Sequence, residues 1–233
     1  MYTRSAAFYD LIYSWKNYRQ EADQLRSVIR AHRPEAKTIL DVACGTGEHL
    51  RYFPDFARTG IDLDPELLSL AKAKLPDAHF VEADMKGFDL SCQFDVILCL
   101  FSAIGYAVTV ENLNASISCM ARHLNPAGIM LVEPWFTPER WADRRSPGMT
   151  TAENGTLKIC RIFVGRRSGK ISTNTLHYLV ADSDNVEYFT EQHDLGLFTE
   201  EEMHCAFVKV ELSVEFDPIG LTNRGLYLGI KQG

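Results

Sequence analysis

Short apolar runs alternate with amphipathic segments over the first 134 residues. Within 113–124, apolar side chains recur every three or four positions, which is the spacing of one helix face. The apolar runs that we read as strands are residues 38–42, 60–64, 80–81, 94–100 and 129–132. Strands separated by helices of this length form parallel βαβ units with right-handed crossovers. The sequence therefore predicts an α/β fold on a mostly parallel sheet, with helices on both faces.

The pattern changes after residue 134. Residues 136–155 are polar and rich in turn formers, whereas 157–162 and 176–180 are β-capable runs around a Gly-Arg-Arg-Ser-Gly turn. Two such runs around a tight turn predict an antiparallel hairpin, and a third run follows. We therefore expect residues 136–195 to form a small antiparallel sheet, inserted after the fifth strand and covering a ligand cleft.

Residues 196–233 return to the alternation of helix and strand. Thr199 precedes a helical segment and Glu202 stands three positions later, which is the spacing of a capping box. Apolar runs at 210–216 and 226–231 predict two more strands. These strands would bring the main sheet to seven, in a Rossmann-like arrangement.

The N-terminal segment is rich in aromatic residues. A frayed tail does not need them, and apolar residues then recur at helical spacing from Tyr18 to near Arg33. We expect residues 1–33 to form a lid and a helix that packs on the sheet. With a ligand-binding core at 38–134, the segments would make a single domain over 1–233.

Composition and charge exclude several functions. The chain is 46% hydrophobic with a net charge of −7, so it lacks the basic excess that nucleic-acid binding needs. No apolar run approaches the roughly 20 residues of a membrane span, and the first residues lack the apolar core of a signal peptide. We expect a cytoplasmic protein with no nucleic-acid or membrane partner.

The six cysteines of the chain form no C-x-x-C pair and its histidines lack metal-ligand spacing, so we expect reduced thiols and no metal.

The glycine-bearing loop at residues 41–47 follows the first strand directly. We read the next segment, 48–56, as a helix, and a strand, loop and helix N-terminus can hold a nucleotide-like ligand against backbone N–H groups. Ala43 breaks the G-x-G-x-x-G pattern that cradles a pyrophosphate. Asp41 would repel a pyrophosphate but suits a cationic ligand. S-adenosylmethionine (SAM) is such a ligand, because it carries a sulfonium and an ammonium.

Acidic residues also end the next strands. Asp62 stands where a carboxylate can take both ribose hydroxyls, Asp84 can accept from an adenine amino group, and Met85 can cover the ring. The expected cofactor residues are Tyr9, Tyr13, Asp41, Ala43, Gly45, Gly47, Asp62, Leu63, Asp84, Met85 and Leu100. In this order the strand ends resemble those of the class I SAM-dependent methyltransferases. A Rossmann-like domain for another adenosine ligand is the alternative, and it would leave Asp41 and Asp84 unexplained.

A closer resemblance covers most of the chain. It is carried, in order, by Phe8-Tyr9-Asp10, residues 40–50, residues 101–105, Glu133-Pro134-Trp135-Phe136 and Arg224-Gly225-Leu226. These segments are similar to those of the N,N-dimethyltransferases of deoxyaminosugar biosynthesis. The resemblance implies a small-molecule acceptor, most simply the amino group of a nucleotide-linked deoxyaminosugar.

One position departs from that family. The sugar enzymes carry a histidine after the Ile-Gly pair, near the acceptor nitrogen, where this chain has Tyr106. A phenol with a pKa near 10 is a poor base at neutral pH. We therefore expect Tyr106 to tune the reaction rather than make it possible.

The remaining candidates concern closure of the site and acceptor binding. Tyr9 and Tyr13 are candidates for closing the SAM pocket, and we take Tyr13 and Tyr106 as the candidate catalytic residues. The candidates for acceptor binding are Trp135, Phe136, His177 and Arg224. The two aromatic residues follow a strand at its carboxyl end, where open α/β sheets bind ligands. The role of Arg224 as a phosphate ligand rests on the resemblance.

Three other functions stay open from the sequence. The chain could methylate a free small amine such as glycine or sarcosine, methylate a hydroxyl group, or bind SAM without catalysis. A nucleotide-sugar needs a long groove with phosphate donors, whereas an amino acid needs a single carboxylate clamp. The oligomeric state is also open, with a homodimer as one alternative.

Overall fold

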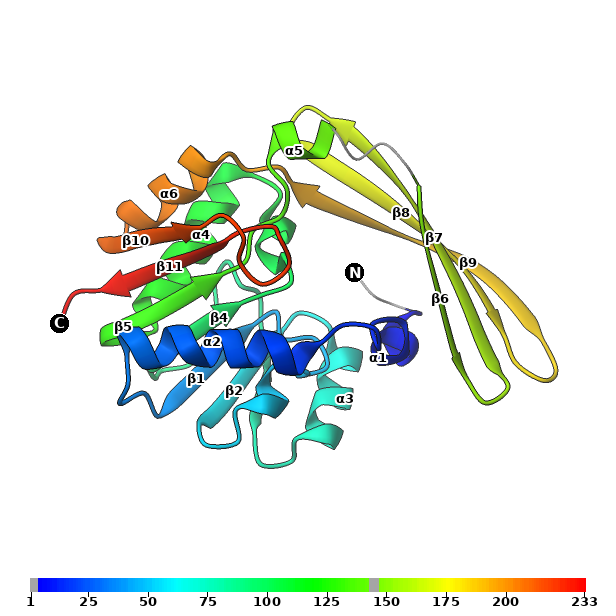
Figure 1. Cartoon of the computed structure of the whole chain (residues 1–233), viewed down its shortest axis with the longest axis horizontal. Helices are drawn as coiled ribbons and strands as arrows, with labels where there is room; N and C mark the ends of the chain where they lie inside the picture. Colours follow the sequence, from blue (N-terminus) through cyan, green and yellow to red (C-terminus); the bar gives the residue numbers. More distant parts are fainter. Residues whose placement is uncertain (1–3, 143–146) are drawn as a thin grey trace.

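A computed structural model describes residues 4–142 and 147–233, and its strands form two separate sheets (Figure 1). The strands are β1 (Thr38–Val42), β2 (Ala57–Asp62), β3 (His79–Glu82), β4 (Phe94–Cys99), β5 (Leu124–Val132), β6 (Gly148–Asn154), β7 (Leu157–Ser168), β8 (Ile171–Ala181), β9 (Val186–Gly196), β10 (Leu212–Asp217) and β11 (Leu226–Lys231). The α-helices are α1 (Tyr9–Ile12), α2 (Tyr18–His32), α3 (Pro65–Lys74), α4 (Val110–Arg122), α5 (Pro138–Ala142) and α6 (Glu200–Val208). Short 3-10 helices are η1 (Ala6–Phe8), η2 (Leu50–Tyr52) and η3 (Ala103–Ala107).

The larger sheet has seven strands in the order β10-β11-β5-β4-β1-β2-β3. The pairs among β1 to β5 are parallel, whereas β11 runs antiparallel to both β5 and β10. From β1 the chain builds outward through β2 and β3, and then returns to place β4 on the other side of β1. Ligands bind outside the carboxyl ends of strands at such a switch point. This confirms the predicted mostly parallel seven-stranded sheet.

Two apolar layers sandwich this sheet. On one face α2 and α3 pack through Leu25, Ile29 and Leu68. On the other face α4 and α6 pack through residues such as Ile117 and Phe207. The strands between them are apolar on both sides, as β4 shows by being buried at all six positions.

Side-chain caps fix the starts of the helices around the sheet. Asp64 accepts from the N–H groups of Glu66 and Leu67, and Pro65 occupies the first turn of α3, where its missing N–H costs nothing. Thr199 and Glu202 form the predicted capping box at the start of α6. These caps are local in sequence, and this is why sequence patterns find them.

The second sheet has the antiparallel order β6-β7-β8-β9 and lies between β5 and α6 in the chain. Its inner face packs on the N-terminal segment: Ile12 and Tyr13 share a buried cluster with Tyr178 and Phe189. Figure 1 shows α1 between the two sheets. The predicted inserted antiparallel sheet is thus confirmed as an element of the fold.

Three local predictions need correction. Residues 48–56 do not form an α-helix, because Pro54 cannot donate an N–H and disfavours a helical Phe53, so that only the short η2 forms. Residues 148–154, read as turn-rich, form the edge strand β6, which gains its order by pairing with β7. The hairpin turn lies at Gly169-Lys170, after β7, rather than over 165–169.

Candidate active site

A cavity of about 1400 Å³ lies between the carboxyl ends of the parallel strands and the inserted sheet. It is lined by residues from the strand-end loops, the N-terminal segment, the loop before β11 and the inner face of β7 to β9. A drug-sized ligand occupies roughly 300–1,000 Å³, so this cavity has room for two ligands side by side. The predicted site residues that line it are Tyr9, Tyr13, Ala43, Gly45, Asp62, Leu63, Asp84, Met85, Leu100, Tyr106, Trp135, Phe136 and Arg224.

One end of the cavity is acidic. The carboxylate of Asp62 accepts the N–H of Gly45 at 2.7 Å and that of Asp64 at 3.0 Å. Gly45 has φ of +54°, which bends the loop tightly enough for this contact. Burial raises the pKa of Asp62 above its ordinary value. The two backbone bonds fix the carboxylate beside the cavity, where it suits vicinal hydroxyl groups.

Asp41 lies beneath this end and does not line the cavity. It is 2% exposed, and its Oδ2 atom has no hydrogen-bond partner in the described part of the chain. Burial raises its pKa to about 7, against the opposing influence of His49. An orphaned buried carboxyl oxygen beside a ligand loop fits a cationic ligand. Gly47 also lies off the lining; with φ of +76° it turns the chain against α3 and β3, near Leu75 and Phe80.

Apolar and acidic groups meet beyond β2 and β3. Leu63 is 47% exposed although it is large and apolar, and it lines the cavity with Met85 and Leu100. Asp84 completes this wall. An apolar wall beside a carboxylate suits a flat heteroaromatic ring that also carries a hydrogen-bond donor.

Aromatic residues of the N-terminal segment form another wall. The rings of Tyr9 and Tyr13 lie 4.7 Å apart, and Tyr13 meets Phe101 edge-on at 5.1 Å. Phe101 and Ser102 follow β4 with φ of 52° and 63°, a left-handed conformation that is strained for such residues. Glu133 and Pro134 hold this turn by accepting the Phe101 N–H and the Ser102 hydroxyl.

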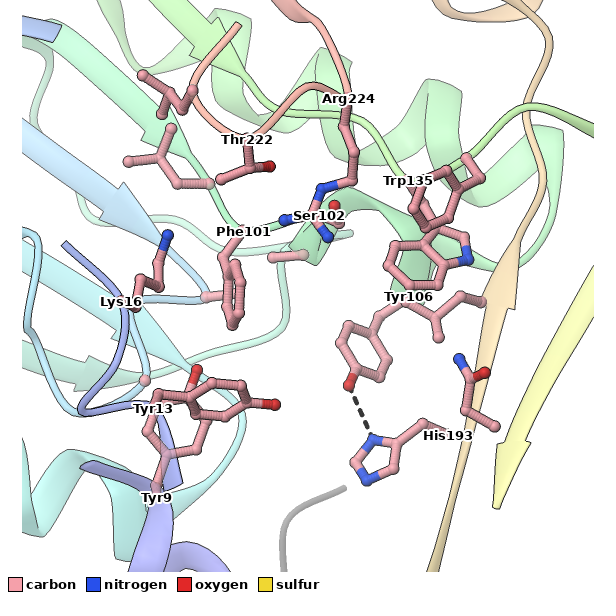
Figure 2. A pocket seen from close by; sticks show the side chains of 18 of the residues that line it. Tyr9, Tyr13, Lys16, Phe101, Ser102, Tyr106, Trp135, His193, Thr222 and Arg224 are labelled. Atoms are coloured by element: carbon pink, nitrogen blue, oxygen red, sulfur yellow. Dashed lines mark hydrogen bonds between the residues drawn. The ribbon is translucent and has the colours of Figure 1, made fainter. Parts of the chain in front are cut away.

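The opposite end of the cavity is basic. Arg224 contacts the wholly buried Glu133 at 3.4 Å, and its guanidinium lies 5.4 to 6.0 Å from the rings of Phe101, Trp135 and Phe136 (Figure 2). Other cations that line the cavity are Lys16, Arg140 and Arg161. Burial lowers the pKa of Lys16, although its ion pair with Glu21 opposes this.

The sequence patterns did not single out His193, which lines the cavity, or Glu191, which lies behind it. His193 of β9 lines the cavity and lies 2.8 Å through Nδ1 from the hydroxyl of Tyr106, as Figure 2 shows. Glu191, two positions earlier, lies behind it with Oε2 at 3.8 Å from Nε2. The alternation of β9, buried at Phe189, Glu191 and His193, was a signal in the sequence. The alternation does not show that His193 faces the cavity until the segments that pack on β9 are known.

His177 lies elsewhere. It does not line the cavity, because β8 alternates and buries Leu176 and Tyr178 on the inner face. The half-exposed imidazole of His177 points to the other face, where Nδ1 lies 2.8 Å from the hydroxyl of Tyr188. His177 is therefore no longer a candidate for acceptor binding.

Comparison with known proteins decides the family. A model of the methyltransferase domain matches residues 39–128. The dTDP-3-amino-3,6-dideoxy-alpha-D-glucopyranose N,N-dimethyltransferase of Streptomyces fradiae is 38% identical over 97% of this chain and 90% of its own length. The chain belongs to the SAM-dependent methyltransferases. The fold of this methyltransferase agrees with that assignment across both sheets.

Two solved structures resemble the methyltransferase over nearly its whole length. Streptomyces venezuelae DesVI matches with a TM-score of 0.92 at 35% identity, covering 98% of this chain and 99% of that one. SAM-bound CalS10, an amino pentose methyltransferase from Micromonospora echinaspora involved in calicheamicin biosynthesis, matches with a TM-score of 0.84 at 33% identity, covering 93% and 92%. The cofactor of the methyltransferase is SAM.

The acidic end of the cavity fits this cofactor. The fixed carboxylate of Asp62 suits the ribose and the wall around Leu63 and Asp84 suits the adenine, whereas Asp41 and Gly47, which were predicted to bind the cofactor, do not line the cavity. Among the described residues, no group of His, Cys, Asp and Glu side chains could hold a metal ion, and no helix is long and apolar enough to cross a membrane.

Proposed function

We propose that this methyltransferase transfers methyl groups to the amino group of a nucleotide-linked deoxyaminosugar. The observation that carries the proposal is the division of charge along one cavity. Asp62 and Asp84 line one end, whereas Arg224 and Arg140 line the other. A cation and a polyanion can therefore bind together, and the whole-chain similarity to an aminosugar dimethyltransferase supports the sugar class.

The basic end suits a diphosphate. Guanidinium groups bind phosphate oxygens through paired hydrogen bonds, and Glu133 fixes the guanidinium of Arg224 from behind. The neighbouring rings of Trp135 and Phe136 lie 4.5 Å apart and offer apolar faces for a sugar or a base. The Trp135 indole donates to the hydroxyl of Ser172 at 2.9 Å, which ties this wall to the inserted sheet.

Methyl transfer from SAM depends mainly on how the protein positions the two reactants. When bound, SAM supplies an activated methyl group on a positively charged sulfur. The residues of the chain must exclude water, align the acceptor and present its nitrogen as a free lone pair. We assign Tyr9 and Tyr13 to closing the cavity, because they pack between the cofactor loop and the inserted sheet.

We also propose a division of labour along the single domain. Residues 1–33 would close the site, 38–134 hold the cofactor, 136–195 cover the acceptor and 196–233 complete the sheet. The lining supports this division, because it draws Tyr9 from the first segment, Asp62 from the second and Leu176 from the third.

A panel assay with labelled SAM tests the function. The panel offers dTDP-linked amino sugars, glycine, sarcosine and simple phenols to the purified protein. We expect turnover with a dTDP-amino sugar at least tenfold above the other acceptors. A preference for glycine, sarcosine or a phenol would overturn the acceptor assignment, and SAM binding without turnover of any acceptor would favour a binding protein.

A further inference from the structure

Tyr106 and His193 meet where the two sheets join. Tyr106 lies on η3, just after β4, and His193 lies on β9 of the inserted sheet. The approach is close because Gly105 has no side chain: a Cβ there would lie 2.9 Å from Leu195 and 3.1 Å from Trp135. The contact between Tyr106 and His193 is therefore built into the junction of η3 and β9.

Glu191 stands behind His193 and is itself held firmly. It is 6% exposed and accepts the N–H groups of Arg4 and Ser5, each at 3.0 Å, and the Ser5 hydroxyl at 2.6 Å. Burial alone would raise the pKa of Glu191, but the nearby imidazole of His193 and the hydrogen bonds from Ser5 lower it to about 2. Glu191 is thus a carboxylate at working pH.

This arrangement selects the tautomer of His193. Nε2 faces the Glu191 carboxylate at 3.8 Å, which favours a proton on that nitrogen. Nδ1 is then the acceptor for the Tyr106 hydroxyl at 2.8 Å. The imidazole can take a second proton at Nδ1, and the carboxylate stabilises the resulting positive charge.

We propose that Tyr106, His193 and Glu191 form a proton relay that removes a proton from the ammonium group of the acceptor. This proposal rests on the amine acceptor of the proposed function. The ammonium gives a proton to the Tyr106 oxygen while Tyr106 gives its own proton to Nδ1 of His193. The tyrosine stays neutral, the imidazole becomes imidazolium, and the amine is left with a free lone pair.

In this relay Tyr106 is the catalytic residue, whereas His193 and Glu191 act through it. The sequence alone predicted that Tyr106 only tunes the reaction, because a phenol is a weak base. The imidazole behind it changes that expectation, since an imidazole accepts a proton far more readily than a phenol and a general base of this kind contributes roughly 10²–10⁴-fold.

The test is the pH dependence of kcat for His193→Gln and Tyr106→Phe, with a dTDP-linked amino sugar as acceptor. At pH 7 we expect each variant to lose roughly 100-fold or more in kcat, with KM and SAM affinity within about twofold of wild type. The loss should shrink toward pH 10, where the acceptor amine already binds in its deprotonated form. The double variant should be no worse than either single variant, because the two residues act as one unit.

Tyr188→Phe is the matched control, because it removes a Tyr–His bond of the same 2.8 Å length on the outer face of the same sheet. Its pH profile should equal that of wild type. A loss that is constant with pH, or that adds in the double variant, would overturn the relay. Should His193→Gln not fold, the profile of Tyr106→Phe decides alone. Wild-type protein that methylates no amino sugar at any pH would overturn the proposed function and the relay together.

Discussion

Arg161 of the inserted sheet donates to the hydroxyl of Tyr13, 148 positions earlier in the chain, at 3.0 Å. The guanidinium carbon also lies 4.9 Å from the centre of the Tyr13 ring, and both side chains are more than nine-tenths buried. This contact joins the N-terminal segment to the sheet that covers the cavity. It places Tyr13 by a charge-assisted hydrogen bond as well as by apolar packing.

Tyr13→Phe keeps the ring and removes this hydroxyl. We expect the free energy of unfolding to fall by about 1–3 kcal/mol, because a buried charged donor loses an acceptor. Urea unfolding followed by fluorescence measures the change. Tyr188→Phe, which alters an exposed tyrosine, should stay within about 0.5 kcal/mol of wild type. Equal stability of the two variants would show that the bond to Arg161 contributes little.

Asp62→Asn should weaken SAM binding by about 10- to 100-fold. The substitution keeps the shape of the side chain but removes the charge that we assign to the ribose hydroxyls, and a charge-assisted hydrogen bond contributes roughly 1.5–3 kcal/mol. Isothermal titration calorimetry with SAM gives the affinity, and Glu66→Gln on the exposed side of α3 is the control. Unchanged affinity in folded Asp62→Asn would mean that other groups hold the ribose.

Asp41→Asn should gain stability over wild type as the pH rises. The folded pKa of about 7 lies above the ordinary value of 3.8. The stability that the protonated carboxyl contributes is therefore fully present below about pH 4 and is lost as the pH rises through 7. Between pH 5 and pH 8 the advantage of Asn, which is neutral throughout, should grow by about 2–3 kcal/mol. Denaturant unfolding without SAM at both pH values measures it, and a constant difference would contradict the buried neutral carboxyl.

Arg224→Gln should raise KM for the nucleotide-sugar by about 10- to 100-fold and leave SAM affinity within about twofold. The guanidinium is the cation that Glu133 fixes at the basic end of the cavity. Steady-state kinetics with a dTDP-amino sugar gives KM, and Arg166→Gln on the exposed end of β7 is the matched control. An increase in KM that is equal in both variants would indicate only a general charge effect.

The sequence by itself determined the parallel core, and it predicted most of the residues that line the acidic end of the cavity. The loop around Gly45, the acids after β1 to β3 and the helix caps at Asp64 and Thr199 are each encoded within a few neighbouring residues. Local patterns of this kind survive without knowledge of tertiary contacts, because strand ends in a parallel sheet always converge on one edge. These local patterns therefore predicted a SAM-binding site from the sequence alone.

Tertiary structure alone decided which residues of the inserted sheet face the cavity. Side chains alternate between the two faces of β8 and β9, and the sequence does not say which face the rest of the chain covers. In the fold His193 lies on the face toward the cavity, whereas His177 lies on the opposite face. Tyr106 meets His193 across 87 positions, and Arg224 meets Glu133 across 91. Such pairs leave no local pattern in the sequence. These pairs form because the inserted sheet covers the strand ends and brings polar groups that are distant in sequence into one buried space. A buried polar group is usually hydrogen-bonded.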